Sequence, residues 1–84
     1  MTRDPRVDPI PKDRVQIDQG DRGFILFTVR AAGRTDHGRG SDCVFVDREI
    51  VREGDVVDRT TFDEILISDW RALVAGGTVL EDRP

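Results

Sequence analysis

The most apolar stretch of the sequence runs Phe24-Ile25-Leu26-Phe27-Thr28-Val29. A run of this length, rich in aromatic and β-branched residues, predicts a strand at the centre of the fold. Successive side chains of a strand point to opposite faces, so Phe27 lies on one face and Leu26 on the other. We therefore expect a central strand that is covered at least in part on both faces, with Phe27 as a structural residue of the core.

A weaker strand pattern and turn residues precede this stretch. Val15 and Ile17 alternate with polar residues, and residues 19–23 (Gln-Gly-Asp-Arg-Gly) are typical of a turn. The sequence thus predicts a strand, a hairpin turn and then the central strand. Further upstream, prolines at positions 5, 9 and 11 mark residues 1–12 as an extended, proline-rich leader. The sequence leaves open whether this leader is disordered or lies strapped along the domain.

Two more strands are expected after the central one. Residues 43–51 resume an apolar strand pattern, and Arg52-Glu53-Gly54-Asp55 turns the chain back. A return strand begins at Val56, and Phe62, Ile65 and Ile67 continue its alternation. We expect this return strand to break around residues 59–61.

A short helix is predicted near the C-terminus. Ser68 suits the N-cap, and the residues after it form an apolar stripe at helical spacing: Trp70, Leu73 and Val74. The glycine pair that follows ends the helix at Ala75. This helix would cover the open end of a curled sheet, with Trp70 as its main structural residue. Thr78-Val79-Leu80 follows as a last short strand.

Five or six short strands, with one short helix before the last, define a mostly β fold class. This order is that of a small SH3-like barrel, which we prefer to a sandwich because 84 residues are too few for two full sheets. The expected domain organisation is therefore a leader over residues 1–12 and a single small β-barrel domain over residues 13–84.

The segment from Arg30 to Asp42 contains three glycines and no large apolar residue, and it predicts a long exposed loop. Such loops often carry the contacts of small domains. The candidate contact residues, for a protein partner or for phosphate, are Arg30, Arg34, His37 and Arg39. The glycine spacing matches neither the dinucleotide-binding nor the P-loop motif.

No catalytic residue, metal ligand or cofactor is assigned from the sequence. His37 stands beside Asp36 and near Cys43, but this spacing fits no familiar metal-ligand pattern, and Cys43 belongs to an apolar strand. Neighbouring carboxylates such as Asp47 and Glu49 fit solvated strand faces. An enzyme is therefore the third-ranked hypothesis, and it needs Asp36, His37 and Cys43 to converge on one pocket or metal ion.

Composition restricts the class of protein. Charged residues make up 36% of the chain, both signs are intermixed, and the formal net charge of −4 disfavours a large phosphate-binding face. Cys43 is the only cysteine, so no intramolecular disulfide forms, as expected in a reducing cytoplasm. No apolar run approaches the ~18 residues of a membrane span, and no signal peptide is visible at the start.

Two resemblances connect the sequence to known families. The Gly20-Asp21-Arg22-Gly23 turn after a strand is similar to that of KOW-type RNA-binding barrels. The start Asp4-Pro5-Arg6-Val7-Asp8-Pro9, together with the Trp70 helix and the 78–80 strand, resembles small phage or prophage proteins of unknown function. Those proteins open with Asp-Pro-Arg-x-Asp-Pro-x-x-Gly-Asp. Here Lys12 replaces the glycine and the middle loop is longer, and the resemblance implies no activity or site residues.

The sequence favours a non-enzymatic binding or accessory protein of phage origin. We expect it to contact a protein partner in a bacterial cytoplasm through residues 30–42 and one barrel face. The alternative hypothesis is a small nucleic-acid-binding barrel that uses Arg30, Arg34 and Arg39. The sequence does not decide whether an exposed edge strand pairs with that of a second copy of the chain.

Overall fold

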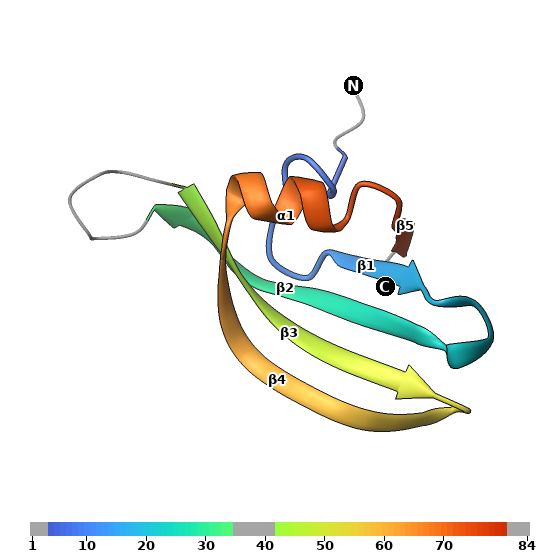
Figure 1. Cartoon of the computed structure of the whole chain (residues 1–84). Helices are drawn as coiled ribbons and strands as arrows, with labels where there is room; N and C mark the ends of the chain where they lie inside the picture. The colour runs from blue at the N-terminus through green and yellow to red at the C-terminus, as the bar shows by residue number, and fades with distance from the viewer. Residues whose placement is uncertain (1–3, 35–41, 81–84) are drawn as a thin grey trace.

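In the computed structural model, five antiparallel strands form one sheet, and one helix lies on it (Figure 1). The structure describes residues 4–34 and 42–80. The elements are β1 (Arg14–Asp18), β2 (Phe24–Arg34), β3 (Asp42–Arg52), β4 (Asp55–Leu66), α1 (Ile67–Leu73) and β5 (Thr78–Leu80). Their order in the sheet is β4-β3-β2-β1-β5. The predicted mostly β class is confirmed, whereas the sheet is not closed, because β4 and β5 form its opposite edges.

Both predicted hairpin turns are present. A 3-10 turn over Gly20–Arg22 joins β1 to β2, and the two strands pair with Val15 opposite Phe27. In the β3–β4 hairpin, Glu53 and Gly54 have φ angles of 53° and 83°. Two consecutive positive φ angles are the geometry of the tight hairpin turn that matches the twist of antiparallel strands.

The prediction of a loop that begins at Arg30 was wrong. β2 continues to Arg34 and pairs with β3, with Ala32 opposite Val44 and Gly33 opposite Cys43, after a bulge between Val29 and Ala31. Small side chains leave no apolar pattern in the sequence, but main-chain pairing does not require one. Residues 35–41, with His37 and Arg39, lie outside the described residues.

Two further boundaries differ from the prediction. The break expected around residues 59–61 is absent, because β4 runs unbroken from Asp55 to Leu66 and absorbs the irregularity as bulges. The helix spans Ile67–Leu73 rather than Ser68–Ala75, so Ile67 begins the helix and does not continue the return strand. Leu66 takes the N-cap position without a side-chain hydrogen bond, so Ser68 falls within the first turn and does not cap the helix.

The core lies between the sheet and α1. Its residues are each at most 2% exposed, namely Val15, Phe27, Val29, Val44, Val46, Trp70 and Val74. The rings of Phe27 and Trp70 meet edge to face, with centroids 5.7 Å apart and an interplanar angle of 84°. Both predicted structural residues are therefore confirmed as core residues. On the opposite face of β2, Phe24 and Leu26 are partly buried, as expected.

The described part of the leader, from Asp4 to Lys12, lies strapped along the domain. The carbonyl oxygen of Asp4 accepts hydrogen bonds from the backbone N–H groups of Val7 and Asp8, which closes a turn. At the other end, the N–H of Lys12 donates to the carbonyl oxygen of Val29. Pro5 and Pro9 are buried. Of the two arrangements that the sequence left open, the structure shows the strap.

Candidate functional site

The candidate contact residue Arg30 lies on β2, on the face of the sheet turned away from α1, which we call the outer face. Its guanidinium makes an ion pair of 2.9 Å with Asp47 of β3. The same guanidinium lies over the ring of Phe62 of β4, 5.4 Å from the ring centroid. Arg34 is the last residue of β2, and its side chain lies outside the described atoms, as do His37 and Arg39. Of the four predicted contact residues, the structure thus describes the side chain of Arg30 alone.

Phe62 combines two features that are unusual in a strand. Its φ angle is 51°, in the left-handed region that disfavours bulky side chains, and 55% of its surface is exposed. Its backbone N–H donates a hydrogen bond of 3.1 Å to Oδ1 of Asp47, while Oδ2 of the same carboxylate holds Arg30. One carboxylate therefore fixes both the backbone of Phe62 and the cation above its ring.

A second aromatic residue completes this group. The ring of Phe45, on β3, lies 6.1 Å from that of Phe62 with an interplanar angle of 42°. We call Arg30, Phe45, Asp47 and Phe62 the Phe62 cluster. It joins three neighbouring strands, β2, β3 and β4, on the outer face, and it holds an exposed aromatic ring against a guanidinium.

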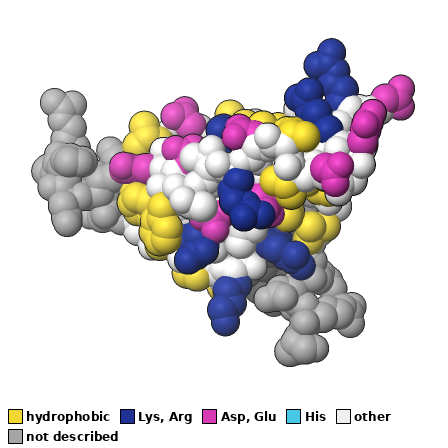
Figure 2. All heavy atoms as spheres, turned by 90° about the horizontal axis from the view of Figure 1, so that it is seen from below, with side chains coloured by type: hydrophobic (Ala, Val, Ile, Leu, Met, Phe, Trp, Pro, Cys, Tyr) yellow, Lys and Arg dark blue, Asp and Glu magenta, His cyan; other side chains and the backbone are white. Residues whose placement is uncertain are grey.

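The outer face is electrostatically mixed. Arg30 is paired with Asp47, and Arg59 of β4 is paired with Glu49 of β3 at 2.6 Å. Figure 2 shows this side of the molecule, where basic, acidic and apolar side chains lie among one another. The two arginines are thus compensated by neighbouring carboxylates, so they do not form the uncompensated basic patch that phosphate binding requires.

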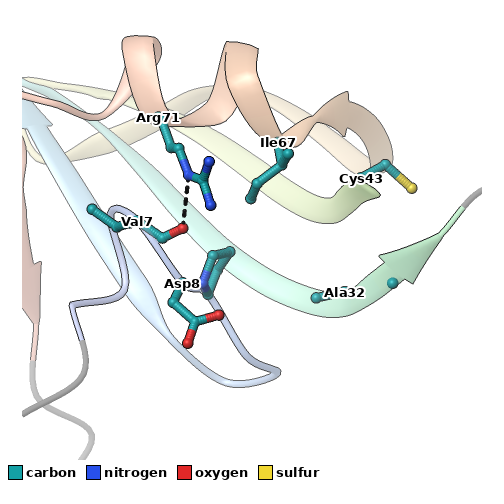
Figure 3. A pocket seen from close by; sticks show the side chains of 8 residues that line it. Val7, Asp8, Ala32, Cys43, Ile67 and Arg71 are labelled. Carbon is teal, nitrogen blue, oxygen red and sulfur yellow. Dashed lines mark hydrogen bonds between the residues drawn. The ribbon is translucent and has the colours of Figure 1, made fainter. Parts of the chain in front are cut away.

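A surface cleft of about 250 Å³ lies between the leader, α1 and the ends of β2 and β3 (Figure 3). It is lined by Val7, Asp8, Pro9, Ala32, Gly33, Cys43, Ile67 and Arg71. The Arg71 Nε–H donates a hydrogen bond of 3.0 Å to the carbonyl oxygen of Val7. The cleft is large enough for a small apolar group, and Arg71 and Asp8 are its charged lining residues.

Of the three residues that the enzyme hypothesis brings together, the structure describes Cys43, which lines this cleft. Cys43 is 1% exposed. Asp36 and His37, which the enzyme hypothesis placed beside it, lie outside the described residues. Within the described ranges, no three His, Cys, Asp or Glu side chains gather as a metal site needs. The same ranges hold no helix long and apolar enough to cross a membrane.

Sequence reasoning did not find Asp47 and Phe62 as a pair. Asp47 was assigned to a solvated strand face, and Phe62 to the alternation of the return strand. A bulge separates the two pairs Val46–Asp63 and Arg48–Thr60, and this bulge brings the Phe62 N–H to the Asp47 carboxylate. The sequence carries no signal for the position of that bulge. Comparisons of the chain with protein-family models, curated proteins and solved structures found no match.

Proposed function

We propose that this chain is a non-enzymatic binding module that contacts a protein partner through the Phe62 cluster. The observation that carries the proposal is the exposed Phe62, held in a left-handed backbone conformation by Asp47. A bulky residue in this conformation costs about 1 to 2 kcal/mol. Backbone strain that the surrounding structure maintains is concentrated at sites of function.

The composition of the cluster supports a protein as the partner. Aromatic and arginine side chains contribute most of the binding energy in many protein interfaces, where they are surrounded by contacts of little energy. In the Phe62 cluster, the Asp47 ion pair and the ring contact restrict the guanidinium of Arg30 before binding. Restricting such a side chain in advance lowers the entropy cost of association.

The alternative, a nucleic-acid-binding barrel, is less well supported. Arg30, the described member of the proposed phosphate contacts, already has a carboxylate at 2.9 Å. Contact with a phosphate would have to displace or overcome Asp47, in a chain whose net charge is −4. We therefore treat nucleic-acid binding as the result that would contradict the proposal.

The proposal includes an SH3-like architecture and a phage-encoded accessory role in a bacterial cytoplasm. The strand order, with β5 returning to β1 after a short helix, supports the first part. For the second part, the two ends that resemble phage proteins contact each other, because the indole of Trp70 donates a hydrogen bond to the carbonyl oxygen of Pro5.

The test is affinity capture from bacterial host or infected cells with three forms of the protein. Phe62→Gly removes the ring and also relieves the positive φ, so it should leave the fold intact. Ile10→Ala removes a side chain of similar exposure on the leader and is the matched control. We expect a partner that wild type and I10A capture equally and that F62G captures at least tenfold less. Equal capture by all three forms would refute the proposal.

A gel shift with nucleic acid at low salt provides the second arm. Binding that weakens steeply as salt rises, and that Arg30→Gln reduces, would replace the proposed function by the nucleic-acid alternative. No shift at low salt, together with Phe62-dependent capture of a protein, supports the proposal.

A further inference from the structure

The two edges of the sheet differ in length. β5 offers three residues at one edge, whereas β4 offers twelve at the other. Figure 1 shows no other labelled element beyond β4 on that side. Val56 and Val57, near the start of β4, are 48% and 57% exposed. An open edge of this length is a template for pairing with another strand.

The charge of β4 indicates what kind of strand it accepts. It carries four acidic residues, Asp55, Asp58, Asp63 and Glu64, against one basic residue, so its formal charge is −3. The basic residue, Arg59, is already paired with Glu49 of β3. None of the ion pairs among the described residues involves the four acids. The edge therefore attracts a positively charged segment.

The same charge disfavours a second copy of this chain. Antiparallel pairing of two β4 strands would bring two segments of charge −3 together, and like charges on neighbouring strands destabilise a sheet. Two bulges also divide the edge, one between the positions opposite Ile50 and Val51 and one between those opposite Val46 and Arg48. Such bulges prevent open-ended growth of a sheet and limit an added strand to a short segment.

We propose that the β4 edge binds an extended basic segment of the protein partner as an added antiparallel or parallel strand. Main-chain hydrogen bonds to β4 supply affinity, and Lys or Arg side chains of the segment face the acids of β4. Phe62 itself lies on β4, so an added strand would run beside this member of the Phe62 cluster. This inference rests on the proposed function for the statement that the partner is a protein.

The experiment uses a seven-residue probe peptide of alternating lysine and valine, with blocked ends. One control peptide carries N-methyl groups at every second residue, which removes hydrogen-bond donors along one edge but keeps the charge. Amide hydrogen exchange of the full chain, followed by NMR, locates the bound peptide. We expect slower exchange in β4 and at least tenfold weaker binding of the methylated peptide.

Charge variants provide the matched protein controls. Asp58→Asn and Asp63→Asn should each weaken binding severalfold, whereas Asp21→Asn, in the exposed turn between β1 and β2, should not. Equal binding of both peptides, or protection outside β4, would overturn the inference. Self-association of the chain that protects β4 amides without peptide would also overturn it, in favour of a second copy.

The two proposals fail in different ways. A partner captured in a Phe62-dependent manner, combined with a probe peptide that leaves β4 exchange unchanged, overturns the edge inference alone. Capture that does not depend on Phe62, combined with protection of β4 by the peptide, overturns the Phe62 cluster as the contact and leaves the basic-strand edge in place.

Discussion

The indole N–H of Trp70 donates a hydrogen bond of 3.1 Å to the carbonyl oxygen of Pro5, across 65 positions of sequence. Trp70 is fully buried, so this N–H has no access to solvent. Two more hydrogen bonds join the leader to the segment around α1. Arg71 Nε donates to the carbonyl oxygen of Val7, and Arg6 donates to the carbonyl oxygen of Gly77. The leader is thus an integral part of the hydrophobic core, because it accepts the hydrogen bond of the largest core side chain.

Substitutions at Trp70 should separate packing from hydrogen bonding. Trp70→Ala removes the ring that meets Phe27 and should cost about 3 to 5 kcal/mol of unfolding free energy. Trp70→Phe keeps an aromatic ring but loses the bond to Pro5, and it should cost about 1 to 3 kcal/mol. Urea denaturation followed by circular dichroism measures both values. Equal losses for the two variants would show that the hydrogen bond dominates over packing.

Removing residues 1–9 should destabilise the domain and expose Trp70. The truncation removes the carbonyl acceptor of the indole N–H and uncovers the ring, and the lost hydrogen bond alone costs about 0.5 to 1.5 kcal/mol because water then solvates the N–H. We expect a lower urea midpoint and a red-shifted tryptophan emission under native conditions. Removal of residues 1–3 alone is the control, because the Pro5, Arg6 and Val7 contacts remain. An unshifted spectrum after the longer truncation would contradict the role of the leader in the core.

The turn at the start of the leader should respond to acid. The side-chain hydrogen bond from Arg6, and then the bond from its backbone N–H, lower the pKa of Asp4 below 3.8. Because the folded-state pKa is the lower one, the stabilisation is complete above the unfolded value and disappears as pH falls through the folded value. NMR titration should give Asp4 a midpoint below 3.8, and Arg6→Gln should raise it. Identical midpoints would contradict this contact.

Local patterns predicted the parts of the fold that depend on neighbouring residues. Phe27 and Trp70 were recognised because alternation and helical spacing mark buried faces, and the 78–80 strand and the turn at residues 52–55 have the predicted positions. The extension of β2 to Arg34 was missed because Ala and Gly pair through the main chain without an apolar signal.

The candidate site was less predictable, since it depends on how strands are aligned. Arg30 was selected from the sequence as an exposed cation, but its partners Asp47 and Phe62 come from two other strands. Their positions relative to Arg30 are set by bulges in β2 and β4, and a shift of one residue changes the face of every side chain that follows. The contact between Pro5 and Trp70 likewise depends on the whole fold.

The two glycines after α1 should differ in how far substitution by alanine lowers the free energy of unfolding. A Cβ atom at Gly77 would lie 2.7 Å from Cγ1 of Val15 and 2.8 Å from Cδ1 of Ile17, whereas at Gly76 it meets open space. Gly77→Ala should therefore cost about 1 to 3 kcal/mol by overpacking. Gly76→Ala should be neutral or stabilise by up to about 1 kcal/mol. Chemical denaturation of the two variants measures the difference, and equal stabilities would contradict the close packing at Gly77.

A double-mutant cycle tests whether Asp47 holds Phe62 in its strained conformation. Asp47→Ala removes the acceptor of the Phe62 N–H and the partner of Arg30, and it should cost about 1 to 2 kcal/mol. In the Phe62→Gly background, no side chain opposes the positive φ and no ring lies under Arg30. The same Asp47→Ala change should then cost less than half as much. Because only coupled residues deviate from additivity, equal costs in both backgrounds would show that Asp47 and Phe62 act independently.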